Sequence, residues 1–370
     1  MKNVLYLVPD VGYGGSTKAI MDIIAGLDRN SWNPVIAMRK QNMSLHRYFR
    51  ELGARTIFMP HSGFSKKHLL KFIYCVLRTY LKIKASDASL IHSNDINSHM
   101  YGIIAARLAG VPIIAHVHIS VTKMRPKTRL ILNRADKIIA VSSQLKSNLS
   151  RLGIEKEKIR VVGNYIDRAD FQNLRGDRIR TEFSLKNKFV IGNVGRLFFG
   201  WKRYDLFFEV CGKVLERFPE TVFMLVGAAA DHTVIDRMKD MARDFGILDQ
   251  LIITGFRKDI PHIMACLDVL LLTSIGEGFG RVLIEALAAG TPVVAFDDCG
   301  QKDIIIHGEN GFLVPTGDTD RMVRRVCQLL EDAPLNMKFG EKGKEIVKDH
   351  FSKDVIFDKL MNIYKEIALK

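Results

Sequence analysis

Short apolar runs alternate along the chain with segments in which apolar residues recur every three or four positions. The runs are typical of buried parallel strands, and the periodic segments are typical of helices. Alternation of this kind predicts parallel sheets with helices on both faces. The predicted strands cover residues 3–8, 33–37, 90–93, 112–116, 137–141, 159–162, 188–194, 221–226, 251–254, 269–272 and 292–295.

The alternation is interrupted by an irregular, polar stretch from Asn164 to Asn187, and it restarts at Lys188. A chain of 370 residues is long enough for two domains of ordinary size. We therefore predict an α/β protein with two doubly wound domains, at residues 1–185 and 186–351. We expect the amphipathic segment at 352–370 to form a helix that packs back on the first domain.

Cysteine usage and hydropathy restrict the class of protein. The five cysteines are scattered and form no C-x-x-C pair, so we expect neither a disulfide framework nor a zinc ribbon. Apolar runs stay shorter than the ~18–20 residues of a membrane helix, and the first residues suit a strand better than a signal peptide. We expect a cytoplasmic protein.

Charge is distributed unevenly between the two halves. Residues 1–190 contain 32 Lys and Arg against 13 Asp and Glu, whereas residues 191–370 contain 23 against 27. A basic half suggests an anionic partner, such as a membrane surface, a nucleic acid or an anionic substrate. A basic surface that merely improves solubility explains the same numbers.

The most informative motif is Glu277-Gly-Phe-Gly-Arg-Val-Leu-Ile-Glu285. Glu277 follows the predicted strand 269–272, at the strand end where open α/β sheets bind ligands. Glu285 lies about two turns into a helix that Gly290 ends, and its apolar neighbours argue against an ordinary surface position. Two carboxylates can accept hydrogen bonds from hydroxyls at separate places, as in the hexose and ribose of a nucleotide sugar.

Basic and glycine-rich loops follow two other predicted strands. Arg196 and Lys202 follow the strand 188–194 and could bind two phosphates, although a solvated charged loop is the plain alternative. Gly14 and Gly15 begin the first helix, where backbone amides bind anions. Their spacing matches neither the dinucleotide fingerprint nor the P-loop, so a simple tight turn remains equally possible.

Histidines and polar side chains gather at strand ends in the first half. His116 and His118 follow the strand 112–116, and His92, Asn94 and Asp95 lie at the end of the strand 90–93. We expect these residues to share one crevice. A metal site would need a third ligand, which the spacing does not supply, and a structural role explains any one histidine equally well.

Asp318 and Asp320 form an Asp-x-Asp pair, which in other proteins can hold a divalent ion beside a diphosphate. They precede a helical pattern at 321–330. Helix capping therefore explains them, and we favour capping over metal binding.

Taken in order, these motifs resemble those of the retaining glycosyltransferases of family 4. The resemblance covers nearly the whole chain and implies the GT-B fold, in which two Rossmann-like domains face each other across a cleft. The matching segments are the Gly14-Gly15 loop, 135–143, 161–167, Gly195-Arg196-Leu197 with Lys202 and Asp205, Glu277 to Val294, and 308–315.

The resemblance implies roles for the donor-binding residues of the second domain. Arg196 and Lys202 would bind the donor diphosphate and offset the charge of the leaving nucleotide, a task that metals perform elsewhere. Glu277 would hold the donor sugar with the amides of Gly278, Phe279 and Gly280, and Glu285 would hold the ribose. No metal and no other cofactor would be required.

For the first domain, the resemblance implies a catalytic position for His118, together with Glu277. The Gly14-Gly15 loop would approach the diphosphate from this domain, and Asn94, Asp95 and His116 would lie on the acceptor side. The expected reaction moves a hexosyl unit from a nucleotide sugar to a saccharide or lipid-linked acceptor, in cell-surface polysaccharide or glycolipid synthesis.

We favour a UDP-sugar over a GDP-sugar and expect no nucleic acid partner. The alternatives left open are a nucleotide-sugar epimerase of the same fold and a basic, non-catalytic scaffold.

Two basic segments of the presumed acceptor domain could meet a membrane. Residues 66–84 place apolar side chains at 69, 72, 73, 76, 77 and 80 with a basic flank, and residues 123–129 add four charges. Helical spacing with a basic flank suits an anionic membrane surface. An ordinary core helix with a solvated face is equally compatible.

Overall fold

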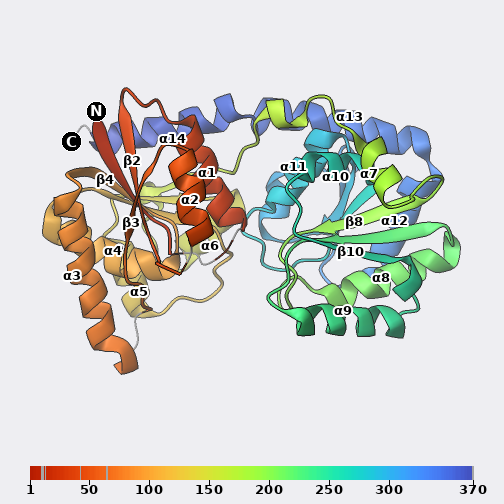
Figure 1. Ribbon diagram of the computed structural model, residues 1–370, viewed down its shortest axis with the longest axis horizontal. Coiled ribbons are helices and arrows are strands. Elements are labelled where there is room, and N and C mark those ends of the chain that lie inside the picture. Colours follow the sequence, from red (N-terminus) through yellow and green to blue (C-terminus); the bar gives the residue numbers. More distant parts are fainter. Residues whose placement is uncertain (10–11, 13, 42, 64–65, 369–370) are drawn as a thin grey trace. The chain divides into compact units, whose positions relative to one another are not determined.

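The computed structural model describes residues 1–9, 12, 14–41, 43–63 and 66–368, and their contacts divide the chain into two compact units (Figure 1). The first domain comprises Met1–Tyr165 and Lys353–Lys370, and the second comprises Ile166–Ser352. The predicted C-terminal helix thus belongs to the first domain, although residues 369–370 of that segment lie outside the described part. The chain passes to the second domain about twenty residues before the predicted boundary at 185.

The first domain contains a parallel sheet of seven strands among the described residues, in the order β3-β2-β1-β4-β5-β6-β7. Its strands are β1 (Lys2–Leu7), β2 (Trp32–Met38), β3 (Arg55–Phe58), β4 (Ala88–Ser93), β5 (Ile113–Val117), β6 (Lys137–Ala140) and β7 (Ile159–Val161). The helices are α1 (Gly15–Gly26), α2 (Met43–Glu51), α3 (Leu69–Ala85), α4 (Ile96–Ala109), α5 (Pro126–Leu132), α6 (Ser143–Arg151) and α14 (Lys353–Ala368).

The second domain contains a parallel sheet of six described strands, in the order β10-β9-β8-β11-β12-β13. Its strands are β8 (Phe189–Val194), β9 (Thr221–Val226), β10 (Leu251–Gly255), β11 (Val269–Leu272), β12 (Val293–Phe296) and β13 (Gly311–Val314). The helices are α7 (Gly176–Glu182), α8 (Tyr204–Arg217), α9 (His232–Asp244), α10 (Ile260–Cys266), α11 (Arg281–Ala289), α12 (Thr319–Glu331) and α13 (Ala333–His350).

Both sheets are doubly wound and parallel, which confirms the predicted fold class. The strand β11 has the predicted bounds, and α11 ends at Ala289 with Gly290 as its C-cap, in a left-handed conformation with φ of 86°. The sequence reading missed β3 and β13. Each is a four-residue strand at a sheet edge, so neither carries a long buried apolar run.

Helix α7 precedes β8 in sequence and packs against α10 in the second domain. A Cβ atom on Gly176 would lie 2.4 Å from the carbonyl oxygen of Ala265, so glycine is needed for this close approach. This contact places the segment just before residue 185 in the second domain. The polar composition of residues 164–187 had instead predicted a connection between the two domains.

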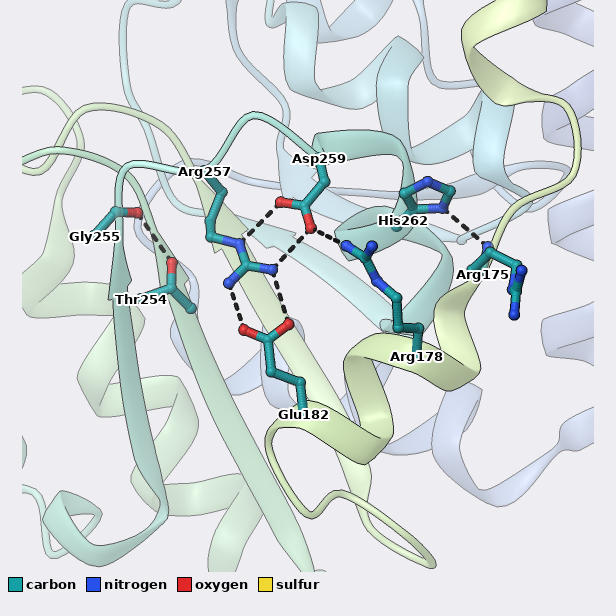
Figure 2. Close-up of polar contacts among 8 residues, drawn as sticks. All are labelled: Arg175, Arg178, Glu182, Thr254, Gly255, Arg257, Asp259 and His262. Carbon is teal, nitrogen blue, oxygen red and sulfur yellow. Dashed lines mark hydrogen bonds and ion pairs between the residues drawn. The ribbon is translucent and has the colours of Figure 1, made fainter.

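Ion pairs reinforce the position of α7 (Figure 2). The guanidinium of Arg257 donates to both carboxylate oxygens of Glu182 at 2.5 and 2.9 Å, and it also pairs with Asp259 at 2.8 Å. Arg178 reaches the same Asp259 carboxylate at 2.7 Å. The loop that follows β10 is therefore tied to α7 by a network of four charged side chains.

Helix α14 packs on the first sheet beside α1, although it follows the whole second domain in sequence. Its Tyr364 is fully buried, and the hydroxyl lies 2.6 Å from Nδ1 of His92 on β4 and 3.1 Å from the hydroxyl of Tyr6 on β1. The ring also contacts Trp32 edge-on, at a centroid distance of 5.5 Å. The C-terminal helix is thus fixed to the sheet by apolar and polar contacts together.

Within the described part of the chain, no helix combines the length and the apolar character that a membrane span requires.

We predict that Tyr364→Phe destabilises the first domain by about 1–3 kcal/mol, because it leaves buried groups of His92 and Tyr6 without their hydroxyl partner. The chain has two tryptophans, one in each domain, so Trp32 fluorescence in a Trp201→Phe background reports the unfolding of the first domain during denaturant titration. Tyr74→Phe, which alters a tyrosine that is 52% exposed, is the matched control. Equal stability of the two variants would contradict the assigned role of the Tyr364 hydroxyl.

Candidate active site

The candidate residues of the second domain lie where the order of its strands reverses. The chain runs outward from β8 to β9 and β10, and then returns to place β11 on the other side of β8. The loops after β8 and β11 therefore meet at the carboxyl edge of the sheet, the position at which open α/β sheets bind ligands. Lys202 comes from the first loop and Glu277 from the second.

Lys202 and Glu277 form an ion pair, with Nζ 2.5 Å from Oε1. Both side chains are largely buried, with 11% and 19% of their surfaces exposed. The hydroxyl of Thr273 donates to the carbonyl of Lys202 at 3.1 Å, and the amide of Ile275 donates to the carbonyl of Trp201 at 2.7 Å. The two loops are thus joined by backbone contacts as well as by charge.

The glycine-rich segment after Glu277 is held by the loop after β12. The amide of Gly300 donates to the carbonyl of Glu277 at 3.2 Å, and the Asp298 carboxylate accepts from the amide of Gly276. A Cβ on Gly300 would lie 2.3 Å from the Cα of Phe279, so no side chain fits there. These contacts fix the backbone that presents the Glu277 carboxylate.

The other two predicted donor residues have different surroundings. Arg196 is exposed on the loop after β8, and its carbonyl accepts a hydrogen bond from the hydroxyl of Tyr204 at 3.5 Å. Glu285 pairs with Arg281 one turn earlier on α11, at 2.8 Å, and only 15% of its side chain is exposed. The limited exposure of Glu285 agrees with its apolar sequence neighbours.

The candidate residues of the first domain also meet at a reversal of strand order, here between β1 and β4. Asn94 follows β4, and its side-chain amide donates to the carbonyl of Ser16 at 3.3 Å, next to Gly15. Its Oδ1 accepts a hydrogen bond from Nε2 of His118, after β5, at 2.6 Å. Asn94 therefore links the Gly14-Gly15 loop to His118 and fixes the proton of His118 on Nε2.

Buried histidines support this cluster from inside the sheet. His92 Nε2 lies 3.0 Å from His116 Nδ1, and the rings of His116 and His118 are in contact at a centroid distance of 4.0 Å, tilted by 34°. Nε2 of His116 is buried and has no hydrogen-bond partner among the described residues. Burial lowers the pKa of His92 and His99 to about 3, and it also lowers the pKa of His116 and His118. These imidazoles are therefore neutral at pH 7.

Two predicted acids serve as helix caps. Asp95 accepts hydrogen bonds from the amides of Asn97 and Ser98 at 2.9 and 3.2 Å, in a capping box at the start of α4. Asp318 caps α12 through the amide of Arg321 at 2.9 Å, which confirms the capping interpretation. The described residues contain no cluster of three or more His, Cys, Asp or Glu side chains suited to a metal ion.

Sequence reasoning missed several residues that build the two clusters. Arg281 could have been found, because it stands four residues before Glu285 on the same helix. Tyr364 could not, because 272 positions separate it from His92. Gly300 lies between the matching segments 277–294 and 308–315, and its role depends on a backbone approach that only the folded structure shows.

Comparison with known families identifies the class of protein. The family model described as glycosyl transferases group 1 matches residues 177–346, and the model of glycosyltransferase family 4 matches residues 13–170. The chain belongs to this glycosyltransferase family, and it is an enzyme of the group 1 type with the GT-B fold, as its motifs predicted. The epimerase and scaffold alternatives are therefore set aside.

Similar proteins span nearly the whole chain. The chain is 25% identical to UDP-Gal:alpha-D-GlcNAc-diphosphoundecaprenol alpha-1,3-galactosyltransferase of Escherichia coli, covering 95% of this chain and 96% of that protein. It is also 25% identical to the capsular polysaccharide biosynthesis glycosyltransferase CapM of Staphylococcus aureus, over 88% and 91%. The solved structure of Anabaena Alr3699/HepE with UDP-glucose covers 99% of this chain and 100% of its own, with a TM-score of 0.85 and 20% identity.

We predict that acid weakens the first domain through its buried histidines. The pKa of His92 and His99 is about 3 in the folded domain and 6.5 in the unfolded chain, so only the unfolded chain gains protons as the pH falls below 6.5. The contribution of these neutral histidines to the free energy of unfolding is therefore fully present above pH 6.5. It declines toward pH 3, by up to about 1.4 kcal/mol per pH unit for each histidine.

Denaturant titrations of the Trp201→Phe protein at several pH values measure this slope. His99→Asn should reduce the slope of stability against pH by the contribution of one histidine. His307→Gln, in the second domain, should leave the slope unchanged. An unaltered slope in His99→Asn would show that this ring is not kept neutral by the fold.

We also predict that Gly300→Ala impairs catalysis and folding together. The added methyl group forces the Phe279 backbone aside, at a cost of about 1–3 kcal/mol, and shifts the Glu277 loop. Gly317→Ala is the control, because its Cβ meets no described heavy atom within 4 Å although φ is +87°. Turnover distinguishes the two variants, because the positive φ of Gly317 makes its substitution costly as well and lowers the melting temperature of both. Wild-type turnover in Gly300→Ala would refute the positioning role.

Proposed function

We propose that this glycosyltransferase is retaining and independent of metal, and that it moves a hexosyl unit from a nucleotide diphosphate sugar, with UDP favoured over GDP. We propose a saccharide or lipid-linked acceptor, in the synthesis of a cell-surface polysaccharide or glycolipid at the cytoplasmic face of the membrane. The observation that carries this proposal is the ion pair of Lys202 and Glu277 at the reversal of the second sheet.

The second domain supplies the donor half. A diphosphate carries negative charge that Lys202 and Arg196 can neutralise, one as a point charge and the other as a planar fork. When phosphate oxygens engage Lys202, the Glu277 carboxylate becomes able to accept hydrogen bonds from hexose hydroxyls. The amides of residues 278–280 and the carboxylate of Glu285 provide further contacts for the sugar and the ribose.

Positive charge at the diphosphate also supports independence from metal. The bond between the sugar C1 and the diphosphate oxygen breaks while negative charge develops on that oxygen, and fixed cations stabilise this charge without reorganisation. Arg196 and Lys202 can provide the cations. The acceptor oxygen bonds to C1 on the same face, and its proton passes to the departing diphosphate, so no carboxylate nucleophile is required.

The first domain supplies the acceptor half. His118 is held by Asn94 with a proton on Nε2, which leaves the lone pair of Nδ1 available, and His116 has a buried Nε2 without a described partner. A neutral donor–acceptor cluster suits hydroxyl groups better than anions. The relatives support the acceptor class, because the Escherichia coli protein is named for a diphosphoundecaprenol-linked sugar and CapM for a capsular polysaccharide.

We predict that Glu277→Gln lowers turnover by about a hundredfold or more and leaves the Kd for free UDP within about threefold, because the carboxylate serves the sugar and not the nucleotide. Turnover is measured as donor hydrolysis or transfer, and UDP affinity by calorimetry. Glu309→Gln alters an exposed acid of the same domain and is the matched control. Equal losses of turnover and UDP affinity would contradict the assignment of Glu277 to the sugar.

A panel of nucleotide sugars tests the reaction class itself. We expect slow hydrolysis of at least one UDP-sugar, unchanged by EDTA, together with thermal stabilisation by UDP greater than by GDP. The anomeric configuration of the product, followed by NMR, should match that of the donor. Inversion, loss of activity in EDTA, or a preference for GDP would each overturn the corresponding part of the proposal.

A further inference from the structure

Helix α3 presents apolar side chains on two opposite faces. One face is buried against the domain and includes Phe72, Val76 and Ile83, and the helix packs against α4. Figure 1 shows α3 at the outside of the first domain, with α4 beside it. The predicted single apolar face is therefore wrong, because Phe72 and Val76 turn inward while other members of that set face solvent.

The outer face of α3 consists of Leu70, Ile73, Tyr74, Leu77 and Leu81, which we call the α3 outer face. Their exposed fractions are 83%, 44%, 52%, 53% and 53%. The spacing i, i+3, i+4, i+7 and i+11 places all five on one side of the helix. Five large apolar side chains exposed next to one another indicate a surface that binds a partner.

Basic residues accompany the α3 outer face. Residues 52–86 contain seven Lys and Arg and no Asp or Glu. By helical geometry, Lys71, Arg78 and Lys82 follow one edge of the stripe. Helix α5 contacts α4 on the same part of the domain, and exposed Lys123 and Arg125 precede α5. The charge and the apolar surface therefore occur on the same part of the domain.

The charge discriminates between possible occupants. In a symmetric dimer the same patch would face its own copy, which would bring two sets of cations together with no local acid to neutralise them. A neutral apolar partner would gain nothing from the basic edge. An anionic bilayer satisfies both features, because the leucines enter the boundary between headgroups and acyl chains while the cations stay among phosphates.

We propose that the α3 outer face, with its basic edge, docks the first domain on an anionic phospholipid bilayer. The helix lies in the plane of the interface and does not cross the membrane. Docking would hold the acceptor half of the enzyme where lipid-linked saccharides are found. The inference is independent of donor chemistry, because vesicle binding is measured without nucleotide. Its failure would leave the proposed transferase reaction in place.

The test is co-sedimentation of the whole chain with vesicles of phosphatidylcholine alone and of phosphatidylcholine containing a quarter phosphatidylglycerol. We expect binding to the anionic vesicles at low salt, at least tenfold weaker binding to neutral vesicles, and a steep loss as salt shortens the range of electrostatic attraction from about 30 Å at 0.01 M to about 3 Å at 1 M.

Matched variants locate the surface. Leu77→Glu should weaken binding at least about tenfold, because it replaces a lipid-buried side chain with a charge. Met337→Glu makes the same charge change at a residue of α13 that is 65% exposed, and it should have no effect. Lys71→Gln with Lys82→Gln should weaken binding about tenfold or more, whereas Lys186→Gln with Lys239→Gln, in the second domain, should not.

Thermal melting confirms that each variant is folded, since every substituted side chain is partly or largely exposed. Absence of vesicle binding by the folded wild type at low salt would overturn the proposal, as would equal losses in the test and control variants. A dimer that Leu77→Glu dissociates, detected by sedimentation equilibrium without vesicle binding, would also overturn it and assign the face to a second copy of the chain.

Discussion

The ion pair between Lys202 and Glu277 is the interaction on which the proposed donor half of this enzyme depends. It joins the two loops that flank the reversal of the second sheet, and both side chains are largely removed from water. A buried charge is costly unless it is paired, so each residue requires the other when no substrate is bound. For the proposed reaction, the pair keeps in place a cation that can bind phosphate and a carboxylate that can accept a hydrogen bond from a sugar hydroxyl.

The candidate residues of the first domain are buried as neutral groups, in contrast to the charged pair of the second domain. Burial suppresses the charge of His92 and His116, and the hydroxyl of Tyr364 supplies a hydrogen-bond partner that no residue nearby in sequence provides. The chain returns to this domain after completing the second, and the returning helix α14 brings that hydroxyl. The histidine cluster of the first domain is thus completed only when the last segment of the chain has folded.

The pattern of the sequence was sufficient for the architecture and for most of the candidate residues. Alternating periodicity predicts doubly wound sheets. Glu277 follows a strand of four consecutive apolar residues, which the sequence pattern identifies directly. Contacts between distant segments could not be predicted, because neither Tyr364 nor Gly300 carries a local signal of its partner. The prediction of a single apolar face on helix α3 was wrong for a different reason. The helix is apolar on two faces, and sequence spacing alone does not reveal which face meets the core.

A double-mutant cycle on Lys202→Gln and Glu277→Gln tests the central claim most directly. Turnover of a UDP-sugar and affinity for UDP are measured for the wild type, both single variants and the double variant. Since each single substitution leaves a partner charge uncompensated, we predict non-additive losses in turnover, with a coupling of about 1 kcal/mol or more. We also predict weaker UDP binding in Lys202→Gln than in Glu277→Gln. Additive losses, with equal UDP affinity in the two single variants, would contradict it.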